Sequence, residues 1–214
     1  MNSPKEQSNL KLSVSTKCCF LALSILGIAI MKPCVLSWDN AWAHQRTSLH
    51  IPGDLAKAVQ LAEVFAHGSG IIAILGTLFW LDIPRRKLLL YPMVTCLSAG
   101  IIANGLKLVF TRIRPHADNN LTALDNWMPL FSGKFLDATH RSFPSGHSAT
   151  AVGLAIGLSL VYPQGKYLFV LFALLACLQR IVSESHFPSD VLAGIVIALC
   201  SSLIIDRFIA KPAT

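Results

Sequence analysis

The sequence predicts an all-α membrane protein, a polytopic bundle of about six transmembrane helices in a single domain over residues 1–214, with interfacial helices on its outer side. Apolar residues make up 53% of the chain and charged residues only 14%, whereas a soluble domain averages about 25% charged residues. The mean hydropathy is +0.57. Too few charges remain to cover a soluble surface, and the composition equally excludes disordered, collagen-like and coiled-coil chains.

Six apolar segments have about the length that crosses a bilayer, roughly 20 residues. They are Cys18–Trp38, Val64–Ile83, Leu88–Leu106, Gly146–Tyr162, Tyr167–Ser183 and Pro188–Ile205. The first is interrupted by Lys32-Pro33, and the fourth is short. Tryptophan and tyrosine residues stand at several span ends, as is typical of the aromatic belts of membrane proteins.

The distribution of Lys and Arg favours cytoplasmic N- and C-termini. Nine basic residues fall on each side, but the inner nine are concentrated in short tails and turns such as Pro84-Arg85-Arg86-Lys87. The outer nine are spread over long loops that also carry most of the acidic residues. An alternative reading is a signal peptide cleaved near Ala41-Trp42-Ala43, although Lys32-Pro33 and Asp39 separate that site from the apolar run. Cleavage would leave the topology of the remainder unchanged.

Two long loops fall on the predicted outer side. In the first, Asp54 is expected to cap a helix with an apolar stripe at i, i+3, i+4, i+7 spacing, and this helix either lies on the outer leaflet or packs on the bundle. The stripe consists of Leu55, Ala58, Val59, Ala62, Phe65 and Ala66. In the second loop, Trp127, Phe131 and Phe135 recur at i, i+4, i+8 and form either a lipid-facing aromatic face or the loop's own core.

Charge and cysteine patterns exclude two other classes of protein. The net charge of +7 could suggest a nucleic-acid partner, but the basic residues are scattered between apolar runs, so we expect none. All six cysteines lie in or beside apolar segments, which argues against a disulfide framework and a CxxC-type metal site. They are interpreted as small packing residues.

Charged and polar residues gather at the predicted outer ends of the last four spans, where ionisable residues suggest function. Three clusters form: Lys107 with Arg114-Pro115; Ser142-Phe143-Pro144-Ser145-Gly146-His147; and Arg180 with His186 and Asp190. The topology brings all three to a common depth in the membrane.

These residue types suit the chemistry of a phosphate group. Lys107, Arg114 and Arg180 supply positive charge and N–H donors for an oxyanion. Pro144-Ser145-Gly146 is predicted to open a helix whose free backbone N–H groups point at the anion. Asp190 would then lie in the first turn of the last span, where it can hold one nitrogen of His186 and leave the other free to attack. His147 is suited to protonating a leaving oxygen.

The three clusters resemble the signature of the type 2 phosphatidic acid phosphatase family, which shares its site with vanadium haloperoxidases. The family pattern reads K-x6-RP, then PSGH, then SR-x5-H-x3-D. The first two blocks match in full, and the third departs only at Gln179, where the family has serine. Haloperoxidase activity is disfavoured because those relatives are soluble.

The resemblance implies a role for each signature residue. His186 is expected to form a phosphohistidine intermediate, with Asp190 orienting it, and His147 to act as general acid and then to activate water. The implied phosphate cage consists of Lys107, Arg114, Arg180, Ser145 and Gly146. No metal and no cofactor are expected.

Residues outside the pattern are expected to have peripheral or structural roles. Arg112 is interpreted as a surface or headgroup contact, and Glu184 as a possible modulator of the site. Five further histidines are read as loop or interface residues: His44, His50, His67, His116 and His140.

The sequence thus predicts a membrane phosphatase acting at the outer face of a bacterial inner membrane. Its substrate would be phosphatidic acid, phosphatidylglycerol phosphate, a prenyl diphosphate or a lipid A phosphate. Two alternatives stay open: a phosphotransferase that passes the phosphoryl group from the same histidine to a second lipid, and a non-catalytic protein that kept the fold. The oligomeric state is also open.

Overall fold

The computed structural model describes residues 34–45, 52–117, 126–129 and 131–209. The α-helices are α3 (Cys34–Gln45), α4 (Gly53–Leu61), α5 (Gly68–Leu81), α6 (Leu90–Leu106), α7 (Gly146–Val161), α8 (Lys166–Val182) and α9 (Pro188–Ile209). Short 3₁₀ segments join several of them, including η2 (Ala62–Phe65) before α5 and η3 (Ile83–Leu89) before α6. The all-α prediction is confirmed.

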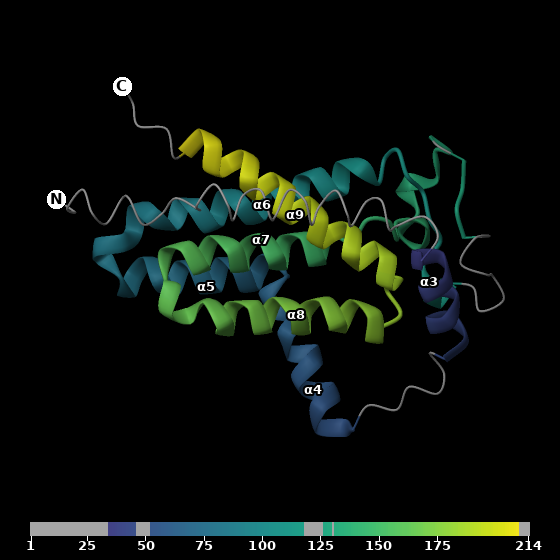
Figure 1. Ribbon diagram of the computed structural model, residues 1–214, viewed down its shortest axis with the longest axis horizontal. Coiled ribbons are helices and arrows are strands. Elements are labelled where there is room, and N and C mark those ends of the chain that lie inside the picture. The colour runs from purple at the N-terminus through teal and green to yellow at the C-terminus, as the bar shows by residue number, and fades with distance from the viewer. Residues whose placement is uncertain (1–33, 46–51, 118–125, 130, 210–214) are drawn as a thin grey trace.

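Helix α7 lies at the centre of the bundle, in contact with α6, α8 and α9. These helices run along the long axis of the molecule, and α3 lies at the end where α6 and α8 finish and where α7 and α9 begin (Figure 1). Small residues on α7 permit close packing. A Cβ atom at Gly157 would come within 2.3 Å of the Cα atom of Pro92 on α6, so only glycine fits there.

Within the described residues, three helical segments are long and apolar enough to cross a membrane: Ile83–Leu106, Pro163–Val182 and Pro188–Arg207. The predicted third, fifth and sixth spans coincide with them. The predicted fourth span is α7, an apolar helix of 16 residues. Most of the predicted first span lies outside the described residues, so the count of six spans stays a prediction. Large apolar side chains are exposed on α5, α6 and α8, as expected for helices that face lipid.

The predicted second span differs from the structure. The segments Gly53–Phe65 and Gly68–Leu81 are bent by 72° at a short break, so the helix here begins only at Gly68. His67 caps α5, because its side chain accepts a hydrogen bond from the backbone N–H of Ser69. As a result, η2 and His67 lie at the end of α5 rather than inside a continuous span.

One local expectation is wrong. Asp54 does not cap α4: the N-cap is Pro52, and Asp54 lies in the first turn, with its carboxylate 3.3 Å from the ammonium of Lys57. In the second loop, the backbone turns at Phe131, which adopts a left-handed φ of 57°. Trp127 packs on Phe143 with ring centroids 5.0 Å apart, but it is still 36% exposed, and Phe131 is more exposed.

The apolar stripe through α4 and η2 is buried at one end and exposed at the other. Val59, Ala62, Phe65 and Ala66 are buried, and η2 packs against α8 through the ring contact between Phe65 and Phe172. Leu55 at the start of α4 is exposed. The part of the stripe nearest α5 therefore belongs to the bundle.

Candidate active site

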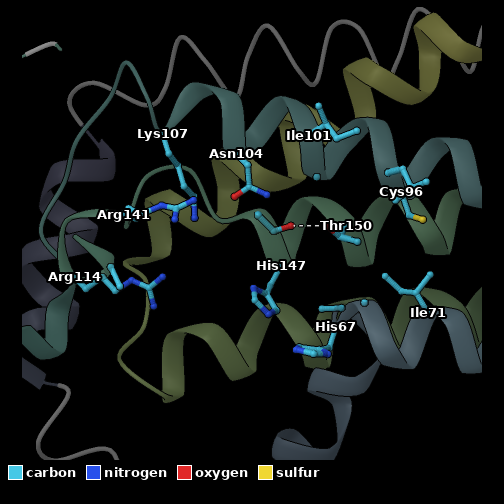
Figure 2. Close-up of a pocket in the computed structure, with 16 residues that line it drawn as sticks. His67, Ile71, Cys96, Ile101, Asn104, Lys107, Arg114, Arg141, His147 and Thr150 are labelled. Carbon is cyan, nitrogen blue, oxygen red and sulfur yellow. Dashed lines mark hydrogen bonds between the residues drawn. The ribbon is translucent and has the colours of Figure 1, made fainter. Parts of the chain in front are cut away.

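A cavity of about 510 Å³ opens at the end of the bundle where α6 ends and α7 begins. Lys107, Arg114 and Arg141 reach it from one side, and His147 and His67 lie across from them (Figure 2). Lys107 directly follows α6, and the two arginines come from the loop that leads to α7. The cavity therefore has a strongly cationic wall that faces two imidazoles.

The start of α7 borders this cavity. Ser145 is the N-cap, as predicted, and its hydroxyl accepts hydrogen bonds from the backbone N–H and the hydroxyl of Ser148, at 3.3 and 2.9 Å. Gly146 lines the cavity. The first N–H groups of a helix have no partners within the helix and attract anions. The roles of Ser145 and Gly146 in binding phosphate stay predictions.

The third cluster is buried beside the cavity. Asp190 lies in the first turn of α9, as predicted, and the backbone N–H of Ser145 donates to its carbonyl oxygen at 2.9 Å. A Cβ atom at Gly194 would come within 2.4 Å of the carbonyl oxygen of Ser145, so a glycine here lets α9 press against the start of α7. His186 is within electrostatic range of Lys107 and Arg114. The structure thus brings the three signature clusters together.

His186 and Asp190 face each other without a hydrogen bond. The Nδ1 atom of His186 lies 3.7 Å from the Oδ2 atom of Asp190, which is too long for a hydrogen bond. Catalytic hydrogen bonds are often long in a ligand-free site and tighten when the substrate is bound. Because Nδ1 faces the carboxylate, Nε2 is the nitrogen available to a substrate.

Burial controls the protonation of His186, which is 1% exposed. Removal from water lowers the pKa of this imidazole to about 4, Lys107 and Arg114 act in the same direction, and Asp190 opposes them. The ring is therefore neutral at pH 7 and has a lone pair to offer. Burial, together with Arg114 and Arg141, also lowers the pKa of Lys107 to about 8, so its ammonium is mostly charged at neutral pH.

The expectation for Arg112, a surface or headgroup contact, is wrong. Its side chain is 0% exposed and donates to Asp190 at 2.7 Å and to Asp39 on α3 at 2.9 Å. It also donates to the hydroxyl of Ser189 at 2.7 Å. Its guanidinium lies over the ring of Phe187, 3.9 Å from the centroid. Arg112 thus ties the carboxylate next to His186 to a helix that sequence reasoning did not connect with the site.

Arg180 has a carboxylate partner that the sequence pattern did not reveal. Its Nη2 atom donates to the Oε1 atom of Glu63 on η2 at 2.6 Å, and its Nε atom donates to the side-chain oxygen of Gln179. The amide nitrogen of Gln179 in turn donates to Glu63 at 3.3 Å. The residue that departs from the family pattern is therefore bonded to the arginine that follows it in that pattern.

His67 is a second residue that the sequence reasoning misplaced. It was read as a loop or interface residue, but it lines the cavity with its ring centroid 6.2 Å from that of His147. Its imidazole Nδ1 is 2.9 Å from the hydroxyl of Ser69. His116 is exposed at the surface, as expected, with Nδ1 2.9 Å from the carbonyl oxygen of Glu184. His50 lies outside the described residues.

Within the described residues, no group of three His, Cys, Asp or Glu side chains is placed to hold a metal ion. Metal independence stays a prediction for experiment. Cys96 and Cys177 are buried thiols on α6 and α8, which agrees with their interpretation as packing residues.

Fold and site together define an integral membrane protein whose helical bundle carries a cationic, histidine-containing site at one end. The chain belongs to the PAP2 superfamily, whose sequence profile matches residues 88–212. The resemblance found in the sequence is therefore confirmed. The matched region contains all three signature clusters.

Individual relatives share the family and differ in substrate. The chain is 33% identical over 105 residues to the lipid A 1-phosphatase of Rhizobium etli. This match covers 49% of this chain and 43% of that protein. It is 30% identical over 125 residues to the undecaprenyl-diphosphatase BcrC of Bacillus subtilis, 58% of each chain. The chain thus spans about half the length of the curated relatives it matches.

A solved structure supports the fold. The crystal structure of a transmembrane PAP2 type phosphatidylglycerolphosphate phosphatase from Bacillus subtilis matches with a TM-score of 0.56 and 20% sequence identity. The match covers 90% of this chain and 94% of that one. At this level of identity, the likeness concerns the arrangement of helices.

Proposed function

We propose that this chain is a membrane lipid phosphatase that hydrolyses a phosphomonoester or diphosphate of a bilayer lipid through a phosphohistidine intermediate. The observation that carries the proposal is the charge of the cavity. Three cationic side chains line it, and within the described residues none of them is within salt-bridge distance of a carboxylate. Such a cavity is suited to a multiply charged anion.

An apolar groove next to the cavity is suited to hold the hydrocarbon chain of a lipid substrate. The groove has a volume of about 580 Å³, lies between α5 and α6, and is lined by side chains such as Ile72, Leu75, Phe79 and Met93. It shares Gly68, Ile71, Cys96 and Leu97 with the cationic cavity. A lipid can therefore place its phosphate among the cations while its hydrocarbon chain stays in the groove.

In the proposed mechanism, the Nε2 atom of His186 attacks phosphorus and the bond from phosphorus to the lipid oxygen breaks. His147 gives its proton to that oxygen, so the lipid alcohol leaves neutral. A water molecule then attacks the phosphohistidine, with His147 taking the proton, and inorganic phosphate is released. Lys107, Arg114 and Arg180 stabilise the charge that spreads over the phosphoryl oxygens in each step.

The proposal includes a location. The chain would lie in a bacterial inner membrane with both termini in the cytoplasm and the site facing the periplasm. The relatives' names suggest lipid A phosphates, prenyl diphosphates and phosphatidylglycerol phosphate as candidate substrates.

The test is phosphate release by the purified full chain in detergent, with EDTA, across a panel of those lipids and phosphatidic acid. We expect release from at least one lipid that persists in EDTA. No release from any of them by folded protein would contradict simple hydrolysis, and transfer of phosphate to an added lipid alcohol would indicate the phosphotransferase alternative.

The pH profile provides a separate prediction. The ammonium of Lys107 is charged below its pKa of about 8 and loses its charge as the pH rises through that value, so kcat/KM should fall on the alkaline side. Lys107→Arg, whose guanidinium stays charged, should move this fall to higher pH even if its maximal rate is lower. A wild-type profile that stays level to about pH 10, the ordinary pKa range of lysine, would contradict the prediction.

A further inference from the structure

Arg180 differs from the other cations of the proposed phosphate cage because it already forms an ion pair with a carboxylate. Glu63 lies 2.6 Å from its Nη2 atom, whereas Lys107 and Arg114 have no such partner within the described residues. Carboxylate and phosphate oxygens compete for the same guanidinium N–H groups. A phosphate ion that binds Arg180 must therefore either displace the carboxylate of Glu63 or bind beside it, where the two negative charges repel each other.

The pair is asymmetric in burial. The side chain of Arg180 is 9% exposed and that of Glu63 is 38% exposed, so Glu63 can turn toward water at a lower desolvation cost than Arg180. Glu63 also stands on η2, next to the 72° break, rather than inside one of the long apolar helices. The position of η2 is fixed independently, because Phe65 packs on Phe172 with ring centroids 5.7 Å apart.

Gln179 completes this arrangement. It accepts from the Nε atom of Arg180 and donates to the second carboxylate oxygen of Glu63, so that one guanidinium, one amide and one carboxylate form a closed ring of hydrogen bonds. The serine that the family pattern has at this position carries no amide and is shorter. The departure from the pattern and the presence of Glu63 are thus parts of one feature.

We propose that Glu63 is a counter-charge that weakens the hold of the phosphate cage on inorganic phosphate and so promotes product release. The inference rests on the proposed function, since it concerns the same site. Without this carboxylate, the cations around the cavity would face the product with no competing anion at Arg180. Glu63 acts through Arg180 and is a positioning residue rather than a catalytic one.

The test is calorimetric titration of inorganic phosphate into the purified full chain in detergent, for wild type and Glu63→Gln. The amide keeps the size of the side chain and removes the charge. We expect phosphate to bind about fivefold more tightly to the variant, as for loss of a partly exposed charge pair. Phosphate should also become a stronger product inhibitor. A residue with a merely structural role would give weaker binding, not tighter.

Asp54→Asn is the matched control, because it removes a negative charge from exposed α4, where Asp54 contacts Lys57 and not the cage. Its phosphate affinity should equal that of wild type. If Glu63→Gln does not fold, Glu63→Ala makes the same prediction. Equal or weaker phosphate binding in the charge-removed variant, or no binding in either protein, would overturn the proposal.

These outcomes are distinct from failure of the proposed function. Phosphate titration needs no turnover, so a wild-type chain that hydrolyses no lipid still reports on Glu63. Conversely, an active enzyme whose phosphate affinity does not change in Glu63→Gln would overturn only the role of Glu63.

Discussion

Replacement of His186 by alanine is expected to lower kcat for the lipid substrate by about 10⁴-fold or more, because the proposed mechanism assigns the attack on phosphorus to its Nε2 atom. The imidazole is buried, neutral at pH 7 and adjacent to the cationic cavity. Alanine leaves the cage in place, so inorganic phosphate should still bind. The measurement is the initial rate of phosphate release, with phosphate affinity as evidence that the site is intact.

A change of the substrate's leaving group separates the proposed role of His186 from that of His147. Loss of a general acid typically costs about 10²–10⁴ in rate, but a substrate whose leaving group needs no proton should restore much of that loss. With an aryl phosphate such as p-nitrophenyl phosphate, His147→Ala should therefore recover, whereas His186→Ala should not. His116→Ala, at an exposed position outside the cavity lining, serves as the control and should behave as wild type.

Two results would contradict this assignment. One is phosphate release by His186→Ala at a rate close to that of wild type. The other is a phosphorylated form of the His186→Ala protein trapped by rapid quenching of a labelled substrate, since the label would then be on a different nucleophile.

The bundle was largely predictable because its signals are local. Length and apolarity set α6, α8 and α9, and the start of α7 follows from Ser145, a good N-cap residue directly before a glycine and an apolar run. The signature clusters were predictable for a similar reason. Each block is short, and helices of similar length return the chain to the same end of the bundle.

The rest depends on contacts that no local pattern encodes. Arg112 and Asp39 are 73 residues apart, and nothing near either residue identifies its partner. Glu63 and His67 reach the site only because the chain bends between η2 and α5, at a place where hydropathy alone favours a continuous span. Asp54 was a reasonable capping residue by type, but the helix begins two residues earlier than it implies, with Pro52 as the N-cap.

Replacement of Arg112 by alanine is expected to destabilise the protein by about 3–5 kcal/mol, the usual cost of removing one partner from a buried ion pair. Two carboxylates, Asp39 and Asp190, would lose their shared cation in a place that water does not reach, since their side chains are 1% and 0% exposed. A large fall in the unfolding temperature of the purified protein, together with lost activity, is the expected result. Arg112→Lys should rescue little, because one ammonium cannot match the forked contacts of the guanidinium.

Asp39→Asn separates the structural contribution of Arg112 from its effect on the site. In this variant Asp190 keeps its cation, so activity should be retained better than in Arg112→Ala, although the contact between α3 and the site is weakened. The Arg112→Ala/Asp39→Asn double variant should lose less stability than the two single variants lose in sum, because one of the two carboxylates left without a cation is no longer charged. Simple additivity would mean that the two residues do not act as a pair. An unfolding temperature of Arg112→Ala close to that of wild type would show that water enters the site and solvates Asp190, which would also weaken the case for a dry, neutral His186.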